Sequence, residues 1–267
     1  MLIFVGIIVC MIGLGQFSPT LSRNAPQAPT SPTPEQLDRL LPTPEVHSLP
    51  PTLEQWQMAE PLDDYFSEIE PTLLGYLIWT RFPVRVFVES VAGSRSSGSN
   101  PSAIERSQQW VTSVRAAIEE WNPYIPLQAI DSPETADITI WRSAPPLQGW
   151  SASEQSGDSP TPPALPRARA AETRYQFFVD RASAAPARIS HRFTIYLTPN
   201  QTADYTQATA RHEIGHALGI WGHSPVETDA LYFSQVRHSP PISDRDINTL
   251  KRIYQQPTRL GWEISEE

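Results

Sequence analysis

The stretch HEIGHALGIWGHS, from His212 to Ser224, contains three histidines and a glutamate that could act together on a metal ion. His212 and His216 are four residues apart, so on a helix they can each direct a ring nitrogen at one point. Glu213 flanks that point. Two neutral imidazoles can hold a zinc ion, which lowers the pKa of a water molecule toward about 7, and a carboxylate can then take the proton. The spacing predicts such a centre, although HExxH also occurs on helices where these residues only face solvent.

The third metal ligand is expected just after this helix. Gly219 can adopt the left-handed backbone that ends a helix, and a turn there brings a later residue back toward the metal. We assign His223 as this ligand, because it is close to the turn and follows a second flexible residue, Gly222. Three other side chains remain as alternative third ligands, namely Asp229, His238 and His191.

The segment resembles the zinc motif HExxHxxGxxH of the metzincin metalloproteases, and among them it looks most like the matrixins. His212, Glu213 and His216 match that motif position by position. His223 comes one residue late, because the family position falls on Gly222, which has no side chain to bind a metal. His223 therefore corresponds to the third ligand of the family motif only if the turn accommodates one inserted residue.

A second departure from the family pattern concerns the turn that follows the motif. The family has a methionine in this turn, whereas TDALYFSQ, from Thr228 to Gln235, contains none. Leu231 is the closest substitute, and leucine is apolar and similar to methionine in volume. We therefore expect Leu231 to form an apolar floor beneath the ligands.

The resemblance implies an α+β fold of the metzincin type, which is a twisted mixed sheet with a long helix, a zinc-binding active-site helix and a C-terminal helix. It also implies one catalytic zinc ion held by His212, His216 and His223, with Glu213 as the general base of peptide-bond hydrolysis. A peptide substrate is expected to pair antiparallel with an edge strand, for which Tyr175 to Val179 is the best candidate. Calcium sites are common in the family, but the sequence assigns none.

The elements that position these residues are visible in the hydrophobic periodicity. Alternating apolar residues indicate strands, and apolar residues at helical spacing indicate amphipathic helices. The order is an α+β arrangement, and matrixins have the same order. The expected strands cover residues 82–89, 126–130, 136–143, 173–180 and 191–198, and the expected helices cover residues 102–122, 203–220 and 243–254.

Four regions are expected along the chain. Residues 1–22 are read as a signal peptide or membrane anchor, because residues 2–15 form an uninterrupted apolar run. Residues 23–52 form a Pro-rich linker, residues 53–81 an N-terminal or pro-like segment, and residues 82–267 the catalytic domain with a Pro-rich loop at 145–166. We therefore expect an exported, extracytoplasmic protein that is secreted, periplasmic or membrane-anchored.

Composition limits the partners of this chain. The net charge of −9 and the pI near 5.2, with no cluster of basic residues, argue against a nucleic-acid partner. The single cysteine, Cys10, lies inside the apolar run, so a processed chain has no disulfide and no thiolate ligand. We expect a monomer that acts on a peptide or protein substrate.

The function that the sequence favours is that of a zinc-dependent endopeptidase. One alternative is a catalytically impaired zinc-binding relative that acts as a cell-envelope binding module, which fits the missing methionine and the shifted His223. Another is an envelope structural protein whose histidines are only surface residues. Glu213 favours the enzyme over the binding module, because a pure binding site needs no base, and zinc content separates both from the structural protein.

Overall fold

The computed structural model describes residues 41–58, 63–90, 101–146, 169–181 and 186–264. The predicted signal peptide or anchor (1–22), most of the predicted linker and nearly all of the loop 145–166 lie outside these ranges. Among the described residues, no helix combines the length and the apolar character needed to cross a membrane.

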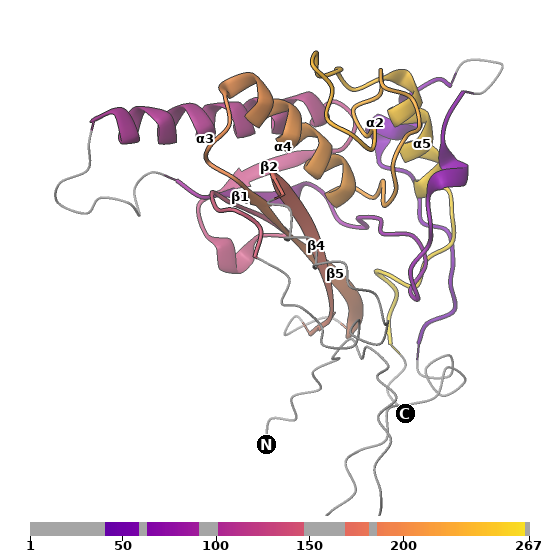
Figure 1. The fold of residues 1–267 in the computed structure, drawn as a ribbon. Helices are drawn as coiled ribbons and strands as arrows, with labels where there is room; N and C mark the ends of the chain where they lie inside the picture. The colour runs from indigo at the N-terminus through magenta and orange to yellow at the C-terminus, as the bar shows by residue number, and fades with distance from the viewer. Residues whose placement is uncertain (1–40, 59–62, 91–100, 147–168, 182–185, 265–267) are drawn as a thin grey trace, which may run out of the picture.

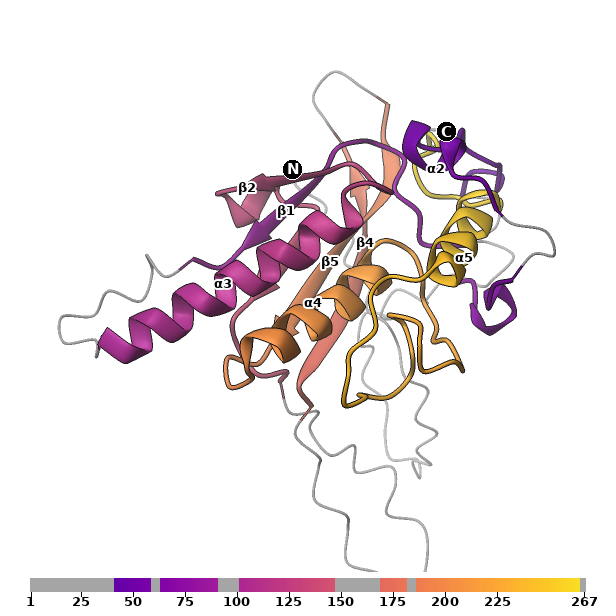
Figure 2. The same cartoon turned by 90° about the horizontal axis from the view of Figure 1, so that it is seen from above.

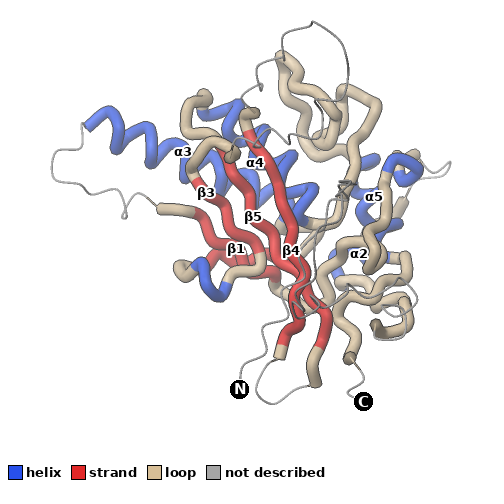
Figure 3. Tube along the Cα trace, turned by 60° about the horizontal axis from the view of Figure 1, so that its bottom comes forward, coloured by secondary structure: helices blue, strands red, loops and turns tan. Residues whose placement is uncertain are grey.

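A five-stranded mixed sheet lies at the centre of the molecule. Four of its strands run parallel, while β4 pairs antiparallel with β5. Strand β4 lies at one edge of the sheet (Figure 3). Within the described residues, no other strand pairs with the outer side of β4. In spatial order the strands are β2 (Leu127–Ile130), β1 (Val84–Val88), β3 (Ile138–Trp141), β5 (Arg188–Leu197) and β4 (Ala171–Asp180).

Two helices, α3 (Pro101–Trp121) and α4 (Ala203–Ala217), cover one face of this sheet (Figures 1 and 2). Alternate strand residues face the same side, so one set of apolar side chains from each of β1, β3 and β5 is buried beneath the helices. The indole of Trp121 is fully buried and donates its Nε1 hydrogen to the Arg211 carbonyl over 2.9 Å. This bond holds α3 against α4 beside His212.

The C-terminal helix α5 (Asp244–Tyr254) packs beside the short helix α2 (Pro51–Gln55) (Figure 1). It begins with a capping box, in which the Ser243 hydroxyl accepts from the Asp246 N–H and the Asp246 carboxylate accepts from the Ser243 N–H. The Lys251 ammonium donates to the Glu54 carbonyl over 3.2 Å, which joins the two helices.

The N-terminal segment, residues 41–81, is part of the same folded unit. Glu45 and Thr258 exchange two backbone hydrogen bonds, and the Tyr65 hydroxyl donates to the Asp246 carboxylate over 2.5 Å. Packing therefore begins before residue 52, where the sequence places the end of the linker. The reason is that Leu41 and Leu49, although sparse in a Pro-rich stretch, dock against the core.

These elements confirm the predicted α+β class and the predicted order of strands and helices. The clearest difference lies in α4, which ends at Ala217 although the periodicity extends to Ile220. Gly219 has a φ of 127°, so the backbone leaves the helical path at this point. The structure also adds α2 and two short 3₁₀ turns at Phe66–Glu68 and Pro133–Thr135.

Candidate metal centre

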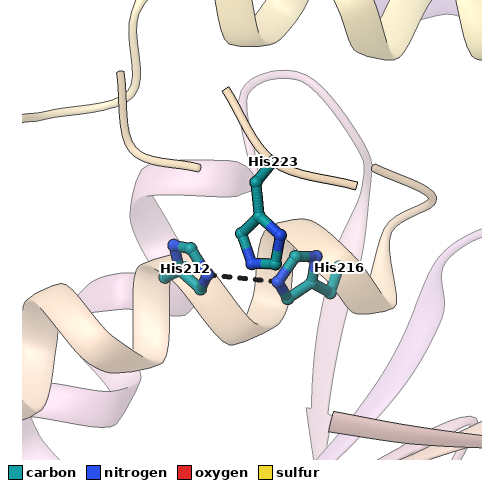
Figure 4. Close-up of side chains that lie close together, drawn as sticks. All are labelled: His212, His216 and His223. Atoms are coloured by element: carbon teal, nitrogen blue, oxygen red, sulfur yellow. Dashed lines mark hydrogen bonds between the residues drawn. The ribbon is translucent and has the colours of Figure 1, made fainter. Parts of the chain in front are cut away.

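Helix α4 presents His212 and His216 on one face (Figure 4). The helix begins after Thr202, whose hydroxyl accepts from the Tyr205 N–H, and the two histidines lie in its second half. Their rings are perpendicular with centroids 4.7 Å apart, and their Nε2 atoms are 3.1 Å apart. The two ligands predicted on the helix are therefore brought together.

The Nδ1 atoms of His212 and His216 are each hydrogen-bonded to a main-chain carbonyl. His212 Nδ1 lies 2.9 Å from the Ala230 oxygen, and His216 Nδ1 lies 2.7 Å from the Ile220 oxygen. Because a carbonyl only accepts, Nδ1 carries the proton whenever these rings are neutral, and each Nε2 atom then presents its lone pair toward the other ring. Two nitrogens bound to one tetrahedral zinc ion lie about 3.3 Å apart. The pair thus fits a metal ion.

His223 reaches the same point from the turn that follows the helix. Its ring centroid lies 5.3 Å from that of His212 and 4.8 Å from that of His216. One nitrogen from each of the three rings lies within 4.8 Å of the other two. The three histidines can therefore bind one metal ion, and the extra residue at Gly222 does not prevent it.

Both neighbours of His223 are fixed by packing. Gly222 lies so close to the preceding segment that a Cβ atom at this position would overlap the Glu68 carbonyl oxygen. Ser224 is fully buried, and its N–H donates to the Leu231 carbonyl over 2.8 Å. The short turn between α4 and Ser224 is therefore positioned from outside by two other segments.

Leu231 occupies the place where the resemblance leads us to expect an apolar floor. It is fully buried, and a Cβ atom added to Gly215 of α4 would come within 2.6 Å of its Cδ2 atom. The carboxylate of Asp246 accepts from the N–H groups of Ala230 and Leu231 over 2.9 and 3.4 Å. Helix α5 therefore holds the turn whose Ala230 carbonyl orients His212.

The three alternative third ligands, Asp229, His191 and His238, lie outside the cluster of His212, His216 and His223. Asp229 is fully buried, but its carboxylate accepts hydrogen bonds from two serine hydroxyls and from the guanidinium of Arg245. His191 is buried in β5, with its ring stacked on Trp79 at a centroid distance of 4.2 Å. His238 lies exposed in the loop before α5.

Glu213 lies beside the metal-binding group and is almost completely buried. Its Oε2 atom accepts a hydrogen bond of 2.6 Å from the Thr173 hydroxyl of β4. Burial raises the pKa of Glu213 above its ordinary value, while the charge of His212 and the Thr173 hydrogen bond oppose this shift. The carboxyl group therefore titrates nearer to neutral pH than an exposed glutamate does, which suits a general base.

Burial also acts on His216 and His223. It lowers the pKa of His216 well below the ordinary value and lowers the pKa of His223, and the charge of His212 adds to both shifts. Because only a neutral imidazole binds a metal, these shifts keep the two rings ready for a cation at mildly acidic pH.

A cleft of about 800 Å³ surrounds the three histidines. One wall is the first part of β4, Ala171 to Thr173, with the preceding residues from Arg169. Other parts of the wall come from Glu68 and Glu70 of the N-terminal segment and from residues 232–236. The cleft therefore lies between the edge strand, the N-terminal segment and the segment that follows the zinc motif.

The edge strand is the one that the sequence predicts, but a different part of it borders the cleft. We expected Tyr175 to Val179, whereas the bordering residues are Ala171 to Thr173. The reason is that Tyr175 turns its ring inward and packs edge-on against Trp221 at a centroid distance of 5.0 Å. Tyr175 and Phe177 of β4 thus pack against the core.

Three functional contacts were not recognised from the sequence. Thr173 bonds Glu213, Asp246 holds the turn before Leu231, and the Glu68 carbonyl contacts Gly222. The alternation in β4 places Thr173 on the same face as Tyr175, which was a usable signal. The contacts of Asp246 and Glu68 join segments far apart in the chain and leave no local pattern.

Comparison with known proteins gives no assignment, because no known family's model matches the chain and no curated protein matches it significantly. The chemistry of the site is therefore inferred from its residues.

Proposed function

We propose that the chain is a zinc-dependent endopeptidase that resembles the metzincins, and among them the matrixins. One observation carries this proposal: three imidazoles meet at one point beside the buried carboxylate of Glu213, in a cleft bordered by an edge strand. A site used only for binding metal has no need of an adjacent buried base.

The chemistry of the ligands favours zinc as the metal. Three neutral histidines with one open position are typical of catalytic zinc sites. A zinc ion at this position supplies a Lewis acid that polarises a peptide carbonyl and acidifies a water molecule. The carbonyls of Ala230 and Ile220 fix the orientation of His212 and His216 and raise the basicity of the two rings.

Glu213 acts as the general base in this proposal. Its carboxylate takes the proton of the attacking water and then passes that proton to the leaving amine. The position of Glu213 supports this role, because its carboxylate is almost completely buried beside the three histidines and is held there by the Thr173 hydroxyl.

The substrate is an extended peptide that pairs with the free edge of β4. Main-chain hydrogen bonds to an exposed strand hold peptides of varied sequence, while the pockets beside the strand select side chains. The cleft volume of about 800 Å³ leaves room for several residues of an extended chain around the metal centre. We propose further that the protein works as an exported monomer.

A second candidate is a zinc-binding relative that has lost catalysis and acts as a cell-envelope binding module. Two sequence features favour it, namely Leu231 in place of the family methionine and the late position of His223. The hydrogen bond that holds Glu213 argues against this candidate, because a binding module needs no positioned base.

The endopeptidase proposal is tested by incubating the purified protein with a mixed peptide library and reading the products by mass spectrometry. We expect stoichiometric zinc, cleavage of library peptides, loss of cleavage after removal of the metal by a chelator, and recovery when zinc is restored. A protein that holds zinc but leaves the library intact supports the binding module. A protein without zinc contradicts both candidates.

A further inference from the structure

Thr173 joins the edge strand to the candidate base. Its hydroxyl oxygen lies 2.6 Å from Glu213 Oε2 and 3.3 Å from the Glu213 carbonyl oxygen, so the hydroxyl hydrogen goes to the closer carboxylate. A length of 2.6 Å is typical of a hydroxyl that donates to an ionised oxygen. Within the described part of the chain, no other group donates a hydrogen bond to this carboxylate. One hydroxyl therefore determines how a buried carboxylate is oriented.

The main chain of Thr173 faces the opposite way, toward the free edge of the sheet. In the antiparallel pair of β4 and β5, Thr198 donates its N–H to the Ala170 carbonyl, and Thr173 lies opposite Ile195. Residues that bond across such a pair alternate along the strand. Ala170 bonds to β5, and Thr173 lies three positions further along the strand, which is an odd number. The N–H and C=O of Thr173 therefore point away from β5.

Thr173 thus has two functions, one through its main chain and one through its side chain. The N–H and C=O of Thr173 are placed to pair with an extended chain in the cleft, and its side chain holds Glu213. The bond to Oε2 leaves Oε1 free of partners within the described residues, so this oxygen can accept a proton.

We propose that Thr173 is a positioning residue, which holds the Glu213 carboxylate in its working orientation and couples that orientation to the strand that binds the peptide. This inference rests on the proposed endopeptidase function. Thr173 touches neither the metal nor, through its side chain, the reacting atoms, and it acts through Glu213.

The test compares three variants of the full chain loaded with zinc. Thr173→Val removes the hydroxyl with little change of shape, and Thr173→Ser keeps the hydroxyl. Thr194→Val removes an equivalent hydroxyl from the neighbouring strand β5, where its one partner among the described residues is Thr139, on the opposite side of the sheet. Cleavage of one library peptide gives kcat and KM, and a competing chelator gives the zinc affinity.

We expect Thr173→Val to lower kcat about 10- to 100-fold, with KM and zinc affinity changed less than about twofold. Thr173→Ser is expected to keep most of the activity, and Thr194→Val to behave as the wild type. The inference is overturned if Thr173→Val retains its kcat, if Thr173→Ser loses as much activity as Thr173→Val, or if zinc affinity falls together with kcat.

Crystal structures of the zinc-loaded wild type and Thr173→Val give a readout that does not depend on cleavage. The carboxylate of Glu213 is expected to turn away from its wild-type position in the variant, and an unmoved carboxylate contradicts the inference. A wild type that binds zinc but cleaves no peptide contradicts the proposed function instead, and these two structures still decide the role of Thr173.

Discussion

At the scale of single residues, the arrangement of His212 and His216 explains why a metal fits here. Their Nε2 atoms are 3.1 Å apart, and the carbonyls of Ala230 and Ile220 hold both protons on the far side of the rings. Each ring is oriented before a metal arrives. The lone pairs therefore repel each other until a cation lies between them, which makes metal binding favourable.

The third ligand is tested by His223→Ala. We expect zinc affinity to fall by at least about 100-fold, because loss of a direct ligand costs more than loss of an outer partner. The matched control is His238→Ala, which removes an exposed histidine outside the metal-binding group. Competition with a chromophoric chelator measures both variants, and equal zinc affinities in the two would remove His223 from the site.

His191 makes stability depend on pH independently of the metal. Its ring is buried against Trp79, its Nε2 atom has no hydrogen-bond partner in the described residues, and burial lowers its pKa from 6.5 to about 3. Between these two pH values the unfolded chain binds a proton that the native state does not bind. The free energy of unfolding therefore falls by about 1.4 kcal/mol for each pH unit below 6.5.

His191→Phe removes this titration and keeps an aromatic ring against Trp79. Between pH 7 and pH 5, the wild type is expected to lose about 2 kcal/mol more stability than the variant, measured by urea unfolding at each pH. Equal losses of unfolding free energy in the wild type and the variant would show that His191 does not cause this pH dependence.

At the scale of elements, the turn between α4 and Ser224 is the part most sensitive to change. Gly219 ends the helix with its φ of 127°, and Gly222 fits against the Glu68 carbonyl. The inserted residue is thus accommodated by a segment that lies more than a hundred residues earlier in the chain. The position of His223 therefore depends on contacts outside the zinc motif.

Gly222→Ala tests this dependence. The new methyl group meets the Glu68 main chain, so the turn must shift, and we expect zinc affinity to fall about 10- to 100-fold. Gly261→Ala is the control, because its Cβ atom meets the Thr80 side chain at a positive φ far from the zinc motif in sequence. It should destabilise the protein and leave the zinc affinity of the folded state unchanged, and the account fails if both variants bind zinc as the wild type does.

The elements show which parts of the fold are readable from sequence. The helix with His212 and His216 and the strands are local patterns, so their periodicity predicts them. The bond between Thr173 and Glu213 joins residues 40 positions apart and depends on which strand lies at the edge. Strand order follows from packing of the whole sheet, and no short pattern specifies it.

At the scale of the whole molecule, the N-terminal segment is built into the structure. Leu53 and Tyr65 are buried in the core, the Tyr65 hydroxyl bonds Asp246, and Glu68 and Glu70 form part of the cleft wall. Because removal of this segment would expose part of the core, we expect it to be a permanent part of the domain.

Truncation tests this interpretation. A chain that starts at Phe82 is compared with one that starts at Leu41, and both are followed by thermal unfolding. The shorter chain loses the buried side chains of Leu53, Tyr65 and other core residues, each of which contributes about 1.5–3 kcal/mol, so we expect it not to fold cooperatively. Equal unfolding temperatures in the two chains would instead support a removable segment.

The central proposal is that Glu213 makes the proposed zinc centre catalytic. Its most direct measurement is the rate of cleavage of one library peptide by the wild type and by Glu213→Ala, with zinc content determined in the same samples. The account predicts equal zinc content and a rate about 100- to 10,000-fold lower in the variant. Equal rates at equal zinc content would contradict it.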